Sequence, residues 1–443
     1  MLTKKVSEYI KKEHLFTEDD DILLALSGGC DSAALFHILK TLKYKFSVAH
    51  CNFKLRGKDS DKDEEFVKKL AEQNKIKIYT ASFDTEEFAR KNKLSVEDAA
   101  RKLRYNWFEE LRINQKFSCI ATAHHLNDRI ETFFINFTKG TGIKGMRSIL
   151  PKNNNIVRPL LFVSKNEIQS FCAEKKIKYR TDKSNFDNYF LRNNLRNNIL
   201  PAFKKINPKF EETMSKNFSI LTDIEKIYRA YINLKKSEIL NIKNKLIFID
   251  TEKLLQTDAP NTVLFEIIRP YGFNSSQSSH IILNINTIQT GKLFYSNTHR
   301  LLKDRKHLII EKAEENNFKS FQISDLQHNN EYNPKLSLKI IEKTENINLT
   351  ANKNTVFFDT DKVKFPLTVR KTRNADFFVP FGMKGKKLLS DFFTDLKINL
   401  FEREKVLLLV TSKNEIIWVI GYRADNRFRV TDKTKKILKI ERL

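Results

Sequence analysis

Short apolar runs alternate with longer amphipathic segments through residues 1–200 of the chain. Four strand-like runs lie at residues 22–26, 46–49, 76–81 and 119–123. Helix-like stretches separate them, among them residues 61–73 and 95–112. This alternation predicts an α/β domain in which a parallel sheet carries helices on both faces. Ligands of such domains bind beyond the carboxyl ends of the strands.

The pattern changes after Pro201. Residues 202–245 are highly charged and helix-like, residues 246–250 predict a strand, and residues 301–310 predict a hairpin. We therefore expect a second, mixed and largely helical domain over residues 202–330, after an α/β domain over residues 1–201.

A polar stretch precedes the last part of the chain. Residues 313–352 are rich in Glu, Asn and Lys and predict a linker with one strand at residues 336–341. Apolar runs return from residue 365, and residues 416–421 predict a buried strand. We expect a small α+β domain over residues 350–443.

The first strand-like run leads directly into Ser27-Gly28-Gly29-Cys30-Asp31-Ser32, and a helix-like segment follows. Adjacent glycines let the backbone approach an anion, and amides at a helix N-terminus point toward that anion. Ser27 and Ser32 add hydroxyl donors, and Asp31 could hold a magnesium ion. A Walker loop is excluded because no Gly-Lys-Ser/Thr follows at the required spacing. The sequence therefore predicts a phosphate-binding turn, with a simple glycine turn as the alternative.

Two further strand-like runs end in polar residues. His50 begins a loop of polar and aromatic side chains that could wrap a base or ribose, or could be an ordinary basic loop. His124 and His125 leave the fourth run, and Asp128 follows them. These side chains could supply an acid/base group and a second magnesium ligand. A zinc site is excluded because further ligands at workable spacing are missing.

A helix with a charged face is predicted to begin after Ser95. Glu97, Arg101 and Arg104 share one face at helical spacing. A solvated ladder of ion pairs is one interpretation. In the other, the two arginines stabilise charge at a reacting phosphate.

Residues 140–145 match the dinucleotide-binding pattern GxGxxG literally. They follow a helix-like segment rather than a strand, so the pattern lacks its required context. We therefore expect a flexible loop beside the site and exclude NAD and FAD.

Composition adds a polyanionic partner to this picture. The chain carries 80 Lys and Arg residues against 54 Asp and Glu residues, a formal net charge of +26, and phosphate contacts dominate nucleic-acid affinity. A Lys-favouring AT-rich genome would produce the same excess, so charge alone leaves the partner open. No run of about 18 apolar residues predicts a membrane span, and we expect no signal peptide and no membrane partner.

The four cysteines, at positions 30, 51, 119 and 172, lie far apart in the sequence without a CxxC pair. This spacing argues against a zinc site, an iron–sulfur cluster and a disulfide framework. It fits a reducing cytoplasm.

Taken in order, these motifs resemble those of bacterial tRNA(Ile)-lysidine synthetases, which belong to the PP-loop ATP pyrophosphatase superfamily with its adenine nucleotide alpha hydrolase-like fold. The matching segments are residues 27–32, 97–105, 123–132, 140–142, 182–185 and 192–196, Pro201, and residues 380–392 and 418–423. The resemblance spans nearly the whole chain and is weakest over residues 205–245 and 313–350.

The resemblance implies a specific reaction. Such enzymes use ATP to adenylate the wobble cytidine in the CAU anticodon of tRNA(Ile), which releases pyrophosphate. The ε-amine of free L-lysine then attacks C2 of the cytosine, the carbon that carries the adenylated oxygen. AMP leaves, and lysidine is formed. The expected cofactors are therefore ATP and magnesium, and the expected partners are this tRNA and L-lysine, with a homodimer left open.

The resemblance also implies site residues. The expected ATP-binding residues are Ser27, Gly28, Gly29, Cys30, Asp31, Ser32 and His50. Asp31 and Asp128 are the expected magnesium ligands and act in catalysis, with Arg101, Arg104 and Arg192 orienting the anticodon base and phosphates. The C-terminal domain is expected to grip the tRNA. Its basic side chains suit contacts with RNA phosphates, with a solubilising basic surface as the alternative; they are Lys384, Lys386, Lys387, Arg423, Arg427 and Arg429, interleaved with Phe381, Trp418 and Phe428.

One departure and two rivals remain. Asn127 and Arg129 flank Asp128 where the family often has Asp and Gln, so their roles are open. A PP-loop tRNA thiolase is the main alternative, and Cys30 and Cys51 leave a redox pair open although no CxxC supports it. A tRNA-binding module with a vestigial ATP site is the other.

Overall fold

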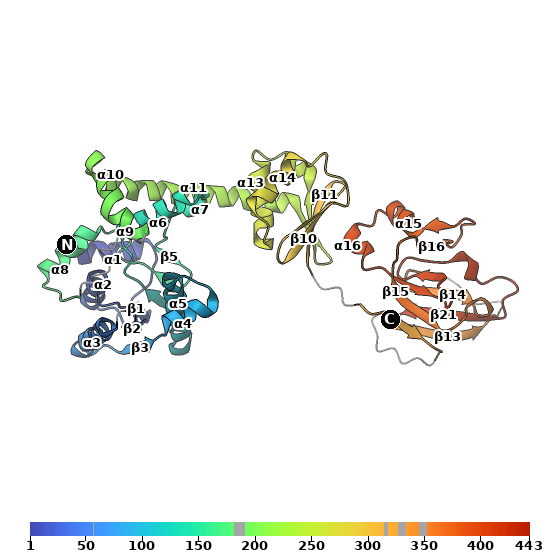
Figure 1. Cartoon of the computed structure of the whole chain (residues 1–443), viewed down its shortest axis with the longest axis horizontal. Coiled ribbons are helices and arrows are strands. Elements are labelled where there is room, and N and C mark those ends of the chain that lie inside the picture. The colour runs from blue at the N-terminus through green and yellow to red at the C-terminus, as the bar shows by residue number, and fades with distance from the viewer. Residues whose placement is uncertain (56, 181–190, 314–317, 327–333, 345–351) are drawn as a thin grey trace. The chain divides into compact units, whose positions relative to one another are not determined.

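The computed structural model describes the whole chain except residues 56, 181–190, 314–317, 327–333 and 345–351. The chain divides into two compact units, Met1–Ala230 and Tyr231–Leu443 (Figure 1). Each unit has its own sheets and its own apolar cores.

A six-stranded sheet forms the centre of the first unit. Its strands are β1 (Ile22–Ala25), β2 (Phe46–Asn52), β3 (Ile78–Ser82), β4 (Cys119–Ala121), β5 (Lys152–Asn153) and β6 (Ile156–Val157). Their order is β3-β2-β1-β4-β6-β5, and all neighbours are parallel except β5 and β6. The four predicted strands are confirmed. The short β5–β6 edge was missed because two-residue strands produce no periodicity.

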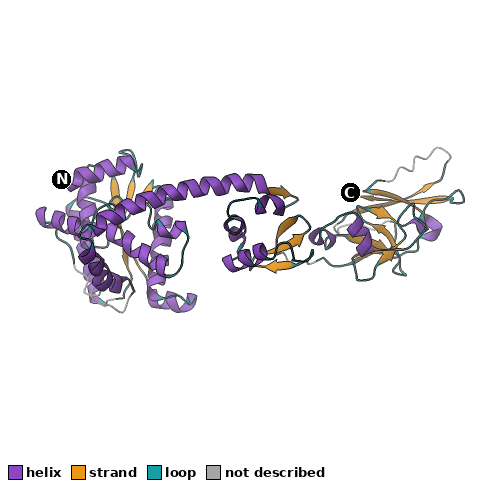
Figure 2. Ribbon diagram, turned by 90° about the horizontal axis from the view of Figure 1, so that it is seen from above, coloured by secondary structure: helices purple, strands orange, loops and turns teal. Residues whose placement is uncertain are grey.

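Helices cover both faces of this sheet (Figure 2). Ile22 and Leu24 of β1 pack into the apolar core that includes α2 (Cys30–Thr41) and α8 (Lys165–Glu174). Leu23 points to the other face and packs with Phe108 of α5 (Val96–Gln115). Because successive side chains of a strand point to opposite faces, one apolar strand supplies both cores. The predicted α/β fold is confirmed.

The first unit contains further helices, the last of which continues past Ala230 into the second unit. They are α1 (Leu2–Lys12), α3 (Lys58–Gln73), α4 (Thr85–Asn92), α6 (Leu126–Thr138), α7 (Ile143–Met146), α9 (Leu191–Asn194), α10 (Leu200–Ile206) and α11 (Phe210–Ile239). A π-helical segment, Leu195–Ile199, joins α9 to α10. Leu126 and Ile130 of α6 pack against Leu200 of α10 and Phe218 of α11 in a separate core.

The second unit begins with an antiparallel sheet and three helices. Its strands are β7 (Leu240–Lys243), β8 (Leu246–Asp250), β9 (Leu293–Tyr295), β10 (His299–Asp304) and β11 (His307–Lys312), and its helices are α12 (Thr251–Leu255), α13 (Pro260–Ile268) and α14 (Ser275–Leu283). The predicted strand at 246–250 and the predicted hairpin are confirmed. Residues 240–243, expected to be helical, form β7 instead because they pair with β8.

The rest of the unit consists mainly of strands (Figure 2). One sheet contains β12 (Phe321–Ile323), β15 (Leu367–Lys371), β18 (Leu407–Val410), β19 (Ile416–Val419) and β20 (Arg423–Ala424). A second contains β13 (Leu336–Glu342), β14 (Thr355–Asp359) and β21 (Lys436–Arg442), and a small hairpin contains β16 (Phe377–Phe378) and β17 (Lys387–Leu388). Two short helices, α15 (Leu389–Asp395) and α16 (Leu400–Arg403), complete it.

The segment expected to be a linker contributes two strands to these sheets. β13 was predicted, but β12 was not, and it pairs with β15 and buries Ile323 completely. β13 pairs with β21 along its whole length. The linker prediction was wrong here because polar neighbours conceal a three-residue strand whose stability comes from its partner.

Across the part of the chain that the structure describes, no helix is both long enough and apolar enough to cross a membrane.

Candidate active site at the carboxyl ends of the parallel strands

The turn between β1 and α2 has the geometry of an anion site. Gly28 has φ of +89°, and a Cβ there would lie 3.3 Å from Cγ2 of Val67, so glycine alone fits without strain. The N-cap of α2 is Gly29, which has no side chain to occupy the first amides of the helix. The hydroxyl of Ser32 lies 3.0 Å from that of Ser27 and donates to the Gly29 carbonyl oxygen. Amides and hydroxyls thus converge, as phosphate binding requires.

This turn faces a cavity of about 440 Å³ at the carboxyl ends of β1, β2 and β4. The structure brings five sequence-predicted residues together in its lining, namely Ser27, Asp31, Ser32, Arg104 and Asp128. They come from three separate segments of the chain, each following a strand or lying on α5. The parallel topology places them at one edge of the sheet.

His125 lies between the two carboxylates. Its Nε2 is 3.7 Å from Oδ2 of Asp31 and 3.6 Å from Oδ2 of Asp128. The backbone amide of His125 also donates to Asp128 Oδ2 at 3.0 Å, which caps α6. Burial alone would raise the pKa of Asp128, but His125 and His124 outweigh it, so its pKa lies below the usual value. Asp128 is therefore ionised at neutral pH.

His124 lines the cavity as a neutral imidazole. Burial lowers its pKa to about 4, so the ring carries no charge at pH 7. Its Nδ1 lies 2.8 Å from the Thr122 hydroxyl. With so low a pKa the ring is a weak base at neutral pH and acts as a hydrogen-bonding group in the cavity.

The two carboxylates fit a magnesium ion that is bound together with phosphate. Among the residues that the structure describes, no group of three or more His, Cys, Asp or Glu side chains could hold a metal. Magnesium, however, commonly takes one or two protein carboxylates and completes its shell with phosphate oxygens and water. Asp31 and Asp128 match that donor set.

Sequence reasoning missed Lys165 at the start of α8. Its Nζ lies 2.6 Å from Oδ1 and 2.8 Å from Oδ2 of Asp31. The two residues are 134 positions apart, so no local pattern could have revealed the pair.

A second, smaller cavity of about 200 Å³ is lined by His125, Lys165, Glu131 and Arg196, among other residues. The Glu131 side chain is completely buried, and Arg196 donates to both of its oxygens, at 2.8 and 3.1 Å. Burial raises the pKa of Glu131 although Arg196 opposes the shift. Sequence reasoning did not single out either residue. The one available signal was helical spacing, since Glu131 lies three positions after Asp128 and Arg196 lies four positions after Arg192.

The three predicted arginines have different surroundings. Arg104 lines the first cavity with its guanidinium 5.0 Å from the Phe53 ring centroid. Arg101 is exposed and lies over the Tyr105 ring. Arg192 approaches Glu131, with 3.6 Å between Nε and Oε2. The solvated-ladder interpretation therefore suits Arg101 better than Arg104.

Two predicted ATP contacts face away from this cavity. His50 is buried with its Nδ1 2.8 Å from the Leu26 carbonyl oxygen, while its neighbours Ala49 and Cys51 line the cavity. Strand alternation sends His50 to the opposite face, where it supports the backbone just before Ser27. We correct the expected ATP contact of His50 accordingly.

Cys30 turns its thiol away from the site as well. Its Sγ lies 3.5 Å from Sγ of Cys172 in α8, and both residues are buried. Cys30 can therefore offer ATP only its backbone amide. The neighbour of Cys30 is therefore Cys172 rather than Cys51, with which the thiolase alternative had left a redox pair open.

One predicted segment cannot be compared with the structure, and another differs from its expectation. Residues 182–185, which carry part of the resemblance, lie outside the described residues. Within residues 140–145, expected to be a flexible loop, α7 begins at Ile143.

The C-terminal basic residues divide into free and paired groups. Lys384, Lys386, Arg423 and Arg429 are exposed, as is the Phe381 ring. Lys387 pairs with Asp395, and Arg427 pairs with Asp425 and Glu415. Trp418 and Phe428 are buried and belong to the apolar core, which confirms the predicted buried strand at residues 416–421.

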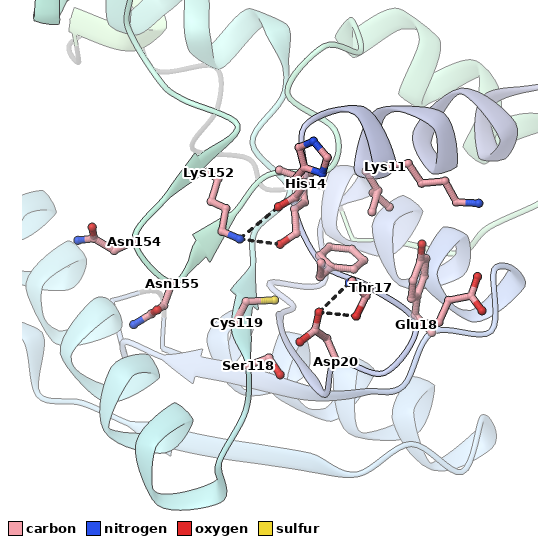
Figure 3. A pocket seen from close by; sticks show the side chains of 14 residues that line it. Lys11, His14, Thr17, Glu18, Asp20, Ser118, Cys119, Lys152, Asn154 and Asn155 are labelled. Carbon is pink, nitrogen blue, oxygen red and sulfur yellow. Dashed lines mark hydrogen bonds between the residues drawn. The ribbon is translucent and has the colours of Figure 1, made fainter. Parts of the chain in front are cut away.

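A larger cavity of about 600 Å³ lies at the amino ends of the same strands (Figure 3). Asp20 precedes β1 and Cys119 opens β4. Two of its charged groups are bonded to the chain itself: Asp20 accepts from Thr17, and Lys152 donates to the carbonyl oxygens of His14 and Leu15 (Figure 3). These bonds join neighbouring segments at the end of the sheet opposite to the Ser27–Ser32 turn.

Comparisons with known proteins agree with this site. A family model described as a PP-loop domain matches residues 1–203. Models described as the TilS substrate binding domain and the TilS substrate C-terminal domain match residues 242–313 and 367–441.

Relatives match over nearly the full length. The tRNA(Ile)-lysidine synthase of Parabacteroides distasonis is 40% identical over 430 residues, covering 97% of each chain. That of Bacteroides thetaiotaomicron is 37% identical over 438 residues, covering 99% of each. Among solved structures, the U34-tRNA thiolase NcsA from Methanococcus maripaludis has a TM-score of 0.42 at 17% identity, covering 50% of this chain and 79% of that chain.

The identity and coverage of the full-length relatives confirm the predicted family and do not favour the thiolase alternative. The chain belongs to the tRNA(Ile)-lysidine synthase family.

Proposed function

We propose that this chain joins L-lysine to the wobble cytidine of the CAU anticodon of tRNA(Ile), through an adenylated cytidine and with release of pyrophosphate and AMP. The observation that carries the proposal is the convergence of the Ser27–Ser32 turn with Asp31 and Asp128 in one cavity, in a member of this family. An intact phosphate turn beside two carboxylates argues against a vestigial ATP site.

The phosphate turn holds the part of ATP that leaves. The amides after Gly28 and the hydroxyls of Ser27 and Ser32 bind the pyrophosphate oxygens. A magnesium ion held by Asp31 and Asp128 would neutralise the charge that develops on the leaving group. Arg104 lines the same cavity, where a guanidinium can hold the α-phosphate or the target base.

We further propose that L-lysine occupies the smaller cavity. Its two ammonium groups and one carboxylate need both signs of charge, and this cavity supplies Glu131 with Arg196 and Lys204. The two cavities share the Asp31–His125–Asp128 cluster as their boundary. If the ε-amine of the bound L-lysine points toward this cluster, it faces the larger cavity, in which the target cytosine would be bound.

The C-terminal basic surface would bind the tRNA away from the anticodon. Shape and phosphate contacts dominate recognition of folded RNA and carry little base information. The choice of cytidine would therefore be made at the catalytic cavity.

The test is incubation of the purified chain with ATP, radiolabelled L-lysine and total bacterial tRNA. We expect label on one tRNA, identified by sequencing as tRNA(Ile) with a CAU anticodon, and pyrophosphate release that requires that tRNA. ATP consumption with no labelled tRNA would overturn the proposal, and sulfur incorporation in a parallel assay would favour the thiolase.

A further inference from the structure

Lys165 is placed where a cation adds little to the fold. It occupies the first position of α8, where the helix dipole disfavours positive charge by about 0.3–1 kcal/mol. The helix start is already stabilised by a capping box between Ser164 and Glu167. The side chains of Lys165 and Asp31 keep 34% and 27% of their surface exposed, and pairs so open to water stabilise a protein little.

The chain nevertheless holds Lys165 firmly at the phosphate turn. Its backbone amide donates to Asn127 Oδ1 at 2.9 Å, and Asn127 donates in turn to Glu211 at 2.6 Å. This arrangement fixes the start of α8 beside Asp31. It also gives Asn127, which departs from the common residue of the family, a positioning role.

Both oxygens of Asp31 face the Lys165 ammonium. A metal ion that takes one of these oxygens must displace the ammonium from it, because two cations repel at such short range. Arg196, the neighbouring cation, is already committed to Glu131. The displaced Lys165 ammonium then needs a new anionic partner, and a phosphate oxygen of the nucleotide arrives together with the metal.

We propose that Lys165 is an ATP-binding residue. Its ammonium pairs with Asp31 in the free enzyme and moves to contact the phosphates when the nucleotide and its metal bind. The proposal rests on ATP use, and it adds a residue of this chain to the phosphate site. Lysine suits the role because its compact ammonium binds phosphate as a point charge and moves on a flexible stem.

The proposal predicts two opposite changes in Lys165→Ala. ATP binding, measured by calorimetry with magnesium and without tRNA or lysine, should weaken about tenfold, because one charge-assisted hydrogen bond to phosphate is removed. Binding of Mn²⁺ alone, measured by electron paramagnetic resonance without ATP, should become tighter, because Asp31 is no longer shielded. Lys165→Arg should retain ATP affinity within about threefold of the wild type.

Lys5→Ala is the matched control, since Lys5 pairs with Glu167 of the same helix at 3.1 Å. It should alter neither measurement. If Lys165→Ala binds ATP as tightly as the wild type, or loses ATP and Mn²⁺ affinity together, the role of Lys165 is overturned. A wild-type chain that binds no ATP would overturn the proposed function itself, and this inference with it.

Discussion

Arg196 holds the completely buried carboxylate of Glu131 with two hydrogen bonds, 2.8 Å from Nε to Oε1 and 3.1 Å from its terminal nitrogen to Oε2. Arg196 lies in the π-helical segment between α9 and α10, and Glu131 lies on α6. Local π-helix is frequent at functional sites because it shifts a side chain out of regular register. Here it brings a cation to a buried carboxylate at the smaller cavity.

Arg196→Ala should destabilise the first unit in a pH-dependent way. Burial raises the pKa of Glu131 in the folded chain, and removal of Arg196 raises it further. Between the unfolded and folded pKa values the folded state then binds more protons, so stability falls as pH rises. We expect a loss of about 2 kcal/mol at pH 7, below the value for a fully buried pair because Arg196 is partly exposed and Arg192 remains nearby.

Chemical denaturation at pH 5 and pH 7 measures this difference, with Lys68→Ala as the control because Lys68 and Glu64 form a surface pair on α3. The control should change stability by less than about 0.5 kcal/mol at either pH. A deficit in Arg196→Ala that is equal at both values would show that Glu131 does not titrate in this way.

Asp31→Asn and Asp128→Asn should fold and still bind tRNA, but lose turnover by at least about 100-fold. Each amide keeps the shape of the side chain and removes the charge that holds the metal and offsets the departing pyrophosphate. Asn at position 128 can still accept the His125 amide that caps α6. Pyrophosphate release and thermal melting, measured on the same preparations, separate chemistry from folding. Near-normal turnover in either variant would remove that residue from the catalytic set.

Local chemistry made part of the site predictable. The Ser27–Ser32 turn lies within six consecutive residues, and the spacing of its glycines and serines alone indicates a phosphate-binding turn. Ser95 likewise predicted the start of α5. Its side chain caps the helix as expected by accepting a hydrogen bond from the backbone amide of Asp98. Contacts of this kind depend on a few neighbouring positions, which a sequence shows directly.

Contacts between distant segments were not predictable in the same way. Lys165 reaches Asp31 across 134 positions, and Cys30 meets Cys172 across 142. His50 faces away from the cavity because of the strand's alternation, which a single polar residue does not reveal. Each of these placements depends on how α8 and β2 pack, and packing is absent from a local pattern.

Removal of the four cysteines should leave lysine attachment intact. The Cys30 thiol faces Cys172 rather than the cavity, so α2 contributes amides and not sulfur to the phosphate turn. A chain with all four residues changed to Ala should retain activity within about threefold once its fold is verified by circular dichroism. A folded variant that cannot modify tRNA would revive the thiolase hypothesis. Cys51→Ala alone serves as the control, because Cys51 lines the cavity.

Salt dependence should reveal whether the hairpin of β16 and β17 contacts RNA phosphates. Lys384 and Lys386 are exposed on it beside Phe381, and Arg423 is exposed on β20. Changing these three basic residues to Ala in the full chain should weaken tRNA binding. The slope of log affinity against log salt should also fall by up to about 3, close to one for each phosphate that is no longer neutralised. Point changes are preferable to truncation after residue 350, because truncation would leave β13 without its partner β21.

A second triple variant provides the matched control. Lys339, Lys413 and Lys433 are exposed in the same part of the chain but outside that hairpin, and their replacement by Ala removes the same total charge. If the basic surface acts only through its overall charge, both triple variants will lose affinity equally and their slopes will fall together. If the hairpin and β20 touch phosphates, the first variant alone will show the reduced slope. Equal slopes in the first variant and the wild type would leave the C-terminal domain without a phosphate-binding role at these residues.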